Sequence, residues 1–205
     1  MEEGVREPYR RLMNDILALP AGPVAEASLA LVRTTESGPL VQHSIRSFLF
    51  ARLIAGQQGV PYEEDLLFAA CVLHDVGLGT FSAGRARFEV EGADLAAALL
   101  GGQGVARADV DRVWEAIALH ASPGIADRMG PLAYLTYQGS FTDASGNAGG
   151  LSAASRERVY AAYPRPADDT SIRDAIAAHA ARSEAAAPPF SISAEFLRQR
   201  NAARA

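Results

Sequence analysis

The chain contains no lysine, so all 19 of its basic side chains are arginine. No basic run occurs and the formal net charge is −5, which argues against nucleic acid or an anionic membrane as a partner. The single cysteine, Cys71, excludes an internal disulfide and fits a reducing compartment. No apolar stretch reaches about 18 residues, and the N-terminus does not resemble a signal peptide. These absences predict a soluble, cytoplasmic protein.

Strand signals are also nearly absent, because the sequence shows no clear apolar/polar alternation and no Asn-Gly hairpin. Helical periodicity recurs instead between proline and glycine breaks. The predicted helices span residues 9–19, 23–36, 40–57, 61–74, 91–102, 108–122, 131–146, 151–164 and 171–187, and a polar tail follows. The prediction is an all-α, single-domain helical bundle in which Cys71 and Trp114 are core residues.

The most unusual stretch is LLFAACVLHD (66–75), in which an apolar helix runs into His74 and Asp75. A buried, unpaired carboxylate costs several kcal/mol, so Asp75 needs a cation or several hydrogen-bond donors. The dipeptide by itself leaves two interpretations open. Asp75 either belongs to a metal site, or caps the next turn or pairs with Arg46 or Arg87.

Other chemistry-bearing residues lie on apolar helix faces. His43 shares a stripe with Phe50 and Ile54, His120 follows Val113 and Ile117, and Asp143 continues a stripe that includes Leu135. A divalent metal site needs imidazoles and carboxylates that converge from several elements. His43, His74, Asp75 and Asp143 come from three predicted helices and can meet inside a bundle. His179 lies among alanines and is predicted to be a surface residue.

Five blocks in this order resemble the HD-domain superfamily of metal-dependent hydrolases, and within it the cyanamide hydratase-like branch. The resemblance covers about residues 40–165. The blocks are HSIRSFLFA (43–51), LLFAACVLHDVGL (66–78), RFEVEGADLAA (87–97), AIALHAS (116–122) and QGSFTDASG (138–146). The implied organisation is an HD domain over 40–165, N-terminal helices 1–39 that pack on it, and a C-terminal helix and tail over 166–205.

The resemblance implies that His43, His74, Asp75 and Asp143 bind a divalent metal. Zinc is favoured, while iron, manganese, nickel and cobalt remain open because mixed imidazole and carboxylate ligands discriminate poorly among them. Asp75 is expected to be catalytic as well, as a proton acceptor. His120 is expected near the site as an outer contact, a substrate contact or a ligand of a second metal.

Three further residues receive implied roles from the same blocks. Glu89 is expected either to hydrogen-bond a ligating histidine or simply to sit in the first turn of a helix. Phe88 is expected to contact substrate. Arg46, one turn after His43, is expected either to neutralise a ligand carboxylate or to bind an anionic substrate.

The implied activity is that of a hydratase or hydrolase in which metal-bound water attacks a cyanamide-like nitrile or a related group of a small molecule. One alternative is a phosphohydrolase acting on a nucleotide or phosphate monoester. Others are oxygen chemistry at a di-iron site and a metal-binding regulatory module without turnover. Assembly as a homo-oligomer is also expected to be possible.

Overall fold

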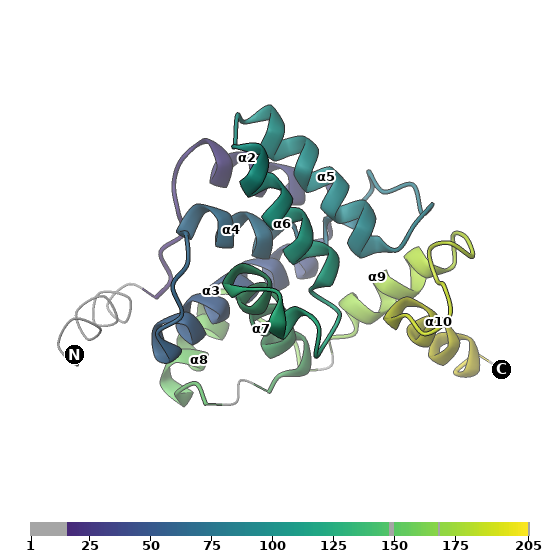
Figure 1. The fold of residues 1–205 in the computed structure, drawn as a ribbon. Coiled ribbons are helices and arrows are strands. Elements are labelled where there is room, and N and C mark those ends of the chain that lie inside the picture. The colour runs from purple at the N-terminus through teal and green to yellow at the C-terminus, as the bar shows by residue number, and fades with distance from the viewer. Residues whose placement is uncertain (1–15, 148–149, 168, 205) are drawn as a thin grey trace.

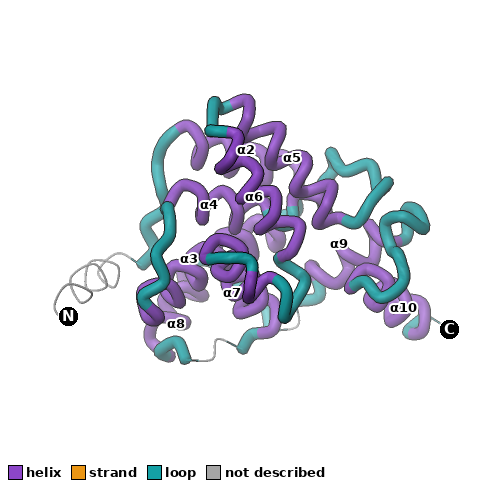
Figure 2. Tube along the Cα trace, in the orientation of Figure 1, coloured by secondary structure: helices purple, strands orange, loops and turns teal. Residues whose placement is uncertain are grey.

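The computed structural model describes residues 16–147, 150–167 and 169–204 (Figure 1). All regular structure in these residues is helical, which confirms the predicted all-α class (Figure 2). The helices are α2 Pro23–Thr35, α3 Gly38–Gln58, α4 Glu64–Leu73, α5 Phe88–Gly102, α6 Arg107–Leu119, α7 Pro131–Ser145, α8 Ala153–Ala162, α9 Ser171–Ala180 and α10 Ile192–Ala202. Short 3₁₀ turns occupy Val76–Leu78 and Ala126–Arg128.

The helix boundaries follow local chemistry. Proline lies in the first turn of α2, α3 and α7, where its missing N–H costs nothing. Helices α3 and α7 end at Gly59 and Gly146, both in the left-handed conformation that terminates a helix without a Cβ clash. Glu64 and Asp65 start α4 and complement its dipole.

The core forms around α4, whose residues Leu66–Leu73 are all buried because α2, α3, α6 and α7 pack around it. The closest helix pair is α3 with α7. At Gly139 of α7, an added Cβ would lie 2.2 Å from the carbonyl oxygen of Ser47, so only glycine permits this approach. The two helices that carry His43 and Asp143 are thereby held in direct contact.

Several boundaries differ from prediction. Helix α5 starts at Phe88, three residues early, because Phe88 and Glu89 are themselves buried. Helix α9 ends at Ala180, and residues predicted as a polar tail form α10. The predicted helix 9–19 lies mostly outside the described residues, and residues 16–19 are not helical. Trp114 is not a core residue: it is 36% exposed and its Nε1 donates to Asp94.

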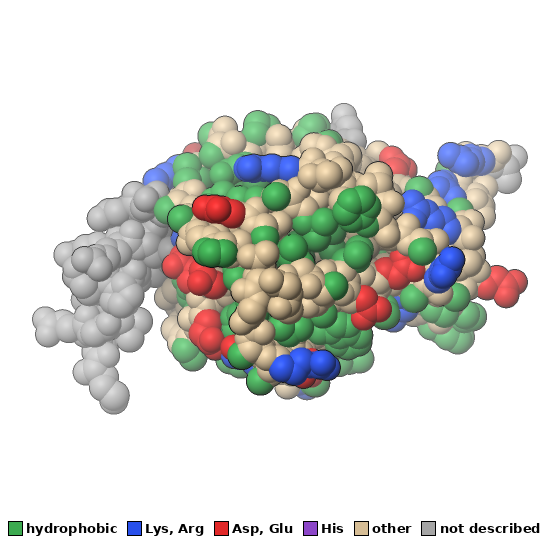
Figure 3. Space-filling view, turned by 90° about the horizontal axis from the view of Figure 1, so that it is seen from above, with side chains coloured by type: hydrophobic (Ala, Val, Ile, Leu, Met, Phe, Trp, Pro, Cys, Tyr) green, Lys and Arg blue, Asp and Glu red, His purple; other side chains and the backbone are tan. Residues whose placement is uncertain are grey.

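Helices α9 and α10 form a pair at the C-terminal end of the molecule (Figure 1). Among the described helices, α10 packs mainly on α9, whereas α9 also touches α3 and α5. Basic side chains, which in this chain are all arginine, gather at this end in the space-filling view (Figure 3). Across the described part of the chain, no helix combines the length and apolar character needed to cross a bilayer.

Candidate metal centre

Local backbone geometry explains why the apolar helix α4 stops directly after its histidine. His74 is the C-cap of α4 and Asp75 leads into the 3₁₀ turn. At Gly77, an added Cβ would lie 2.0 Å from the carbonyl oxygen of Phe88, so the chain passes against the start of α5. The glycine therefore holds Asp75 deep in the core, beside His43 of α3.

His43, His74 and Asp75 form one compact group, here called the metal group. The two Nε2 atoms lie 3.1 Å apart. Asp75 Oδ2 is 3.3 Å from Nε2 of His74 and 3.7 Å from Nε2 of His43. No residue of the group is more than 2% exposed, so water outside the site does not screen these contacts.

The hydrogen bonds of the two histidines fix which ring nitrogens carry lone pairs. His43 donates from Nδ1 to Asp143 Oδ2 at 2.7 Å, and His74 donates from Nδ1 to the carbonyl oxygen of Cys71 at 2.7 Å. When both rings are neutral, the Nε2 lone pair of each ring therefore points towards the other ring and towards Asp75. Asp75 Oδ2 has no hydrogen-bond partner among the described residues.

Three buried acceptors without a donor between them are unfavourable unless a cation joins them. Two imidazole nitrogens and one carboxylate oxygen are a common ligand set for a catalytic divalent metal, with further positions open to water or substrate. The metal group therefore fits the ion that the sequence analysis expected.

The pKa shifts of His43, His74 and Asp75 indicate that the metal group favours the binding of one positive charge. Burial lowers the pKa of His43, and the bond to Asp143 offsets this only in part. Burial also opposes protonation of His74, but the charge of Asp75 outweighs it and raises the pKa of His74. Burial alone would raise the pKa of Asp75, yet His74 and His120 hold it well below the ordinary value.

Asp143 lies behind His43, which differs from its expected place as a fourth ligand. Its Oδ2 accepts from His43 Nδ1 and from Arg46 Nη2 at 2.8 Å, and its Oδ1 accepts from Arg46 Nε at 2.7 Å. Burial raises the pKa of Asp143, but these bonds outweigh it and bring the pKa to about 2. Asp143 is thus a charged partner of His43 that fixes the orientation of the imidazole ring by accepting its Nδ1–H.

Arg46 is 1% exposed and makes a two-pronged pair with Asp143. It also donates to the carbonyl oxygen of Pro164. Of its two expected roles, the structure supports neutralisation of a carboxylate. The assignment of Arg46 to substrate binding is wrong for this arrangement, since its guanidinium is used inside the core and does not line the pocket described below.

His120 lies next to the metal group without joining it. Its Nε2 is 3.6 Å from Asp75 Oδ1, and its Nδ1 donates to the carbonyl oxygen of Ile117 at 2.6 Å. The ring of Phe88 packs edge-on against it, with centroids 5.6 Å apart. His120 and Phe88 therefore form the wall beside Asp75.

Glu89 is fully buried and accepts from Arg87, and no described histidine bonds it. The expected bond from Glu89 to a ligating histidine is therefore wrong, whereas its place in the first turn of α5 matches the simpler interpretation. Cys71 is buried as predicted, and burial raises the pKa of its thiol, which fits a packing role.

A second buried cluster, which sequence reasoning missed, surrounds Glu91. Its carboxylate accepts from the Ser82 hydroxyl and from the backbone N–H groups of Gly84, Arg85 and Ala86. Burial alone would raise the pKa of Glu91, but these donors bring it to about 2. Glu91 thus fastens the loop 79–87 onto α5.

His179 belongs to this cluster, and its prediction as a surface residue is wrong. It is 1% exposed, with Nε2 at 3.0 Å from Ser82 Oγ and 3.4 Å from Glu91 Oε2. The sequence around His179 shows no apolar stripe, because its neighbours are mostly alanine. The contacts that bury His179 come from the loop 79–87, which is distant in the sequence. The cluster fixes α9 to the body of the molecule.

A pocket of about 660 Å³ opens over the metal group. His43, His74, Asp75, His120 and Phe88 line it on one side. Helices α9 and α10 contribute Ile172, Arg173, Ile176, Ile192 and Phe196. The C-terminal region, in which the sequence offered no motif, therefore supplies a large part of the wall.

Comparison with known families and proteins gives one positive result. A family model described as HD domain matches residues 40–200. The match contains every residue of the metal group and extends through α9 into α10, beyond the blocks that carried the resemblance. Among curated proteins, none matches the chain.

Proposed function

The chain belongs to the HD domain family, and from this premise we propose that it is a metal-dependent hydrolase of a small organic molecule. Members of this family are generally metal-dependent hydrolases. The observation that carries the proposal is the metal group itself, in which three buried acceptors converge without a donor at one wall of a large pocket. We propose zinc as the ion, with iron, manganese, nickel and cobalt as the other candidates.

The residues around the metal group have separable tasks in this proposal. When bound, a divalent cation lowers the pKa of coordinated water towards neutrality and polarises a nitrile, carbonyl or phosphoryl group. Asp143 and Arg46 hold the ring of His43 in place through its Nδ1–H. Asp75 accepts a proton from the attacking water, and His120, 3.6 Å from it, returns a proton to the substrate.

For the reacting group, we propose a cyanamide-like nitrile or a related group. The proposal rests on the resemblance of the sequence blocks to that branch and on the apolar wall at Phe88 and Tyr137. Hydration of cyanamide to urea consumes one water, and both of its protons end on the nitrile nitrogen: the first transfer gives isourea, and the second, from the new hydroxyl, gives urea. Asp75 and His120 suit these transfers, because both line the pocket.

The second candidate is hydrolysis of a phosphate monoester, and one observation favours it. Arg165 and Arg173 line the pocket, and arginine binds phosphate well. Arg46, which the sequence analysis considered for an anionic substrate, does not line it.

The test measures two products with the zinc-loaded protein: urea from cyanamide, and p-nitrophenol from p-nitrophenyl phosphate. Turnover of either substrate that is lost in Asp75→Ala supports the hydrolase and selects the reaction. The control is Arg198→Gln, which changes an exposed side chain of α10 that pairs with Glu195 outside the pocket. Metal-loaded protein that turns over neither these substrates nor other nitriles, amides and phosphate esters would contradict the proposal.

A further inference from the structure

The size of the pocket is the first clue to the kind of substrate. Its volume of about 660 Å³ equals on the order of 20 water molecules, at about 30 Å³ each in the liquid. That is within the range of pockets that bind drug-sized ligands. Cyanamide is scarcely larger than a few waters and would leave most of this space to solvent. The volume therefore points to a substrate with a larger body than the reacting group.

The second clue is the apolar and aromatic surface between the metal group and α10. Tyr137 and Phe141 of α7 stack with ring centroids 5.6 Å apart, and both line the pocket. Phe141 is 49% exposed, which is costly for a phenyl ring unless a ligand covers it. Phe196 of α10 adds a third ring to the lining, and Ile172 of α9 adds an aliphatic side chain. This surface suits an aromatic or aliphatic body.

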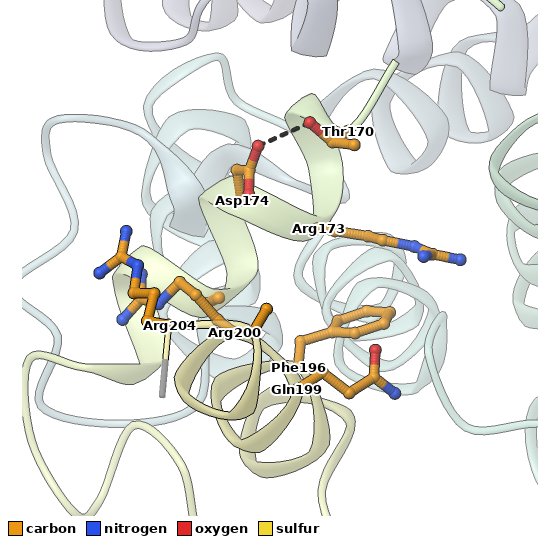
Figure 4. A pocket seen from close by; sticks show the side chains of 9 residues that line it. Thr170, Arg173, Asp174, Phe196, Gln199, Arg200 and Arg204 are labelled. Carbon is orange, nitrogen blue, oxygen red and sulfur yellow. Dashed lines mark hydrogen bonds between the residues drawn. The ribbon is translucent and has the colours of Figure 1, made fainter. Parts of the chain in front are cut away.

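The third clue is the position of Arg173. Its guanidinium lies over the ring of Phe196, 5.7 Å from the centroid. Arg173, Phe196 and Thr170 also line a neighbouring cavity of about 280 Å³ that contains no residue of the metal group. Figure 4 shows Arg173 pointing away from Arg200 and Arg204, along the ring of Phe196. Arg173 therefore marks the side of the pocket that borders this neighbouring cavity.

The fourth clue is charge. Within the described residues, neither Arg165 nor Arg173 forms an ion pair with a carboxylate. Arg165 donates to the backbone carbonyls of Asp143 and Ala144 at the end of α7, which leaves its charge intact. Outside the metal group, Asp169 is the acidic residue of the described lining, and it accepts from the backbone N–H and the hydroxyl of Ser171. Burial opposes ionisation of Asp169, but these bonds outweigh it, and the charge of Arg165 contributes to lowering its pKa. Two guanidinium groups against one carboxylate give the lining outside the metal group a net positive charge.

We infer that the substrate carries an anionic group on an apolar body, with the anionic group bound by Arg173 and Arg165 and the reacting bond at the metal group. The part of this inference that concerns the reacting bond rests on the proposed function. The part that concerns binding of the anionic group does not, and it can be tested separately. The aromatic surface of Tyr137, Phe141 and Phe196 holds the body between these two ends. Arg173 is a specificity residue in this account, because it selects the substrate without touching the reacting bond.

The experiment uses two probes of equal shape, 3-phenylpropionate and its neutral amide, and measures their affinities for the metal-loaded full chain by calorimetry. We expect the carboxylate to bind at least about tenfold more tightly, since a charged hydrogen-bonded pair supplies that much discrimination. Arg173→Gln should remove most of this preference, and Arg165→Gln should reduce it. The matched control Arg198→Gln should leave it unchanged. Circular dichroism and the melting temperature confirm that each variant is folded.

Two outcomes would overturn the inference: equal affinity for the two probes, or a preference for the carboxylate that survives both Arg173→Gln and Arg165→Gln. The second would mean that the carboxylate binds at the metal. Metal content, measured on the same samples, separates this failure from failure of the proposed function. If the native chain binds no metal, the proposed function fails, while the probe comparison still tests the two arginines in that protein.

Discussion

Two buried histidine clusters lie on either side of Phe88, and they differ in the balance of donors and acceptors. The Phe88 ring is 5.6 Å from that of His120, beside the metal group, and 6.3 Å from that of His179 in the Glu91 cluster. In the metal group, acceptors face one another and Asp75 Oδ2 lacks a donor among the described residues. In the other cluster, the carboxylate of Glu91 accepts from the Ser82 hydroxyl and from three backbone N–H groups.

The difference teaches that burial of a histidine beside a carboxylate does not by itself mark a reactive site. A carboxylate whose lone pairs are met by hydroxyl and N–H donors is complete, and it serves to fasten one segment to another. A carboxylate that faces neutral imidazole acceptors favours a positive charge at the group, which a metal ion or a proton on an imidazole supplies. The first arrangement predicts effects on stability, and the second predicts effects on metal affinity.

The largest expected effect comes from His74→Ala. Removing one of three ligands should weaken metal binding by more than the 10- to 100-fold range seen when only an outer partner of a ligand is lost. Competition with a chromophoric chelator measures the affinity. The matched control is His179→Ala, which removes the other buried histidine and should leave the affinity within about twofold, since it touches no ligand. Equal losses in both variants would erase the distinction between the clusters.

Asp143→Asn should have the next largest effect. The amide keeps the size of the side chain but loses the charge that receives His43 Nδ1–H and pairs with Arg46. Metal affinity should fall by about 10- to 100-fold, as for other outer partners of ligating histidines. Asp111→Asn, on the exposed face of α6, is the control. A loss as complete as that of His74→Ala would instead make Asp143 a direct ligand, as the sequence analysis expected.

Much of the fold and the centre of the site follow from sequence, because their signals are local. Apolar periodicity with proline and glycine breaks identified helices α2 to α9, and the apolar run before His74 marked α4 as buried. The sequence could not predict the role of Asp143. Helix spacing places Asp143 near His43, but it does not decide whether the carboxylate accepts from the ring nitrogen of His43 or binds the metal. His179, Glu91 and α10 depend on contacts between distant segments, and α10 has a largely polar sequence.

Glu91→Gln tests the other cluster through its pH dependence. The folded pKa of Glu91 is about 2, below the ordinary value of 4.5. The ionised group therefore stabilises the fold above about pH 4.5, and this contribution is lost as the pH falls towards 2. We expect the variant to lose about 1–3 kcal/mol at pH 7, as when a buried partner of several donors is removed.

Chemical denaturation of native protein and variant at pH 7 and pH 3 measures this difference. The gap in unfolding free energy should narrow at the lower pH. Glu157→Gln, which changes an exposed residue of α8, should show no such gap. A gap for Glu91→Gln that is the same at both pH values would exclude its charge as the cause.

The smallest effect is expected for His179→Ala as a stability variant. Its Nε2 bonds are 3.0 and 3.4 Å long, so its loss should cost about 1 kcal/mol, a typical net value for one hydrogen bond. Thermal unfolding measures the loss, and turnover of the metal-loaded variant should be unchanged. A strong fall in turnover at full metal content would show that the Glu91 cluster contributes to catalysis. The distinction between a structural cluster and a reactive one would then be wrong.

The most direct test of the central claim is an anomalous-scattering map from crystals of the native protein loaded with zinc. The account predicts a strong peak at about 2.0–2.2 Å from Nε2 of His43, Nε2 of His74 and a carboxylate oxygen of Asp75. A map without a peak there, or with zinc only at other sites, would contradict it.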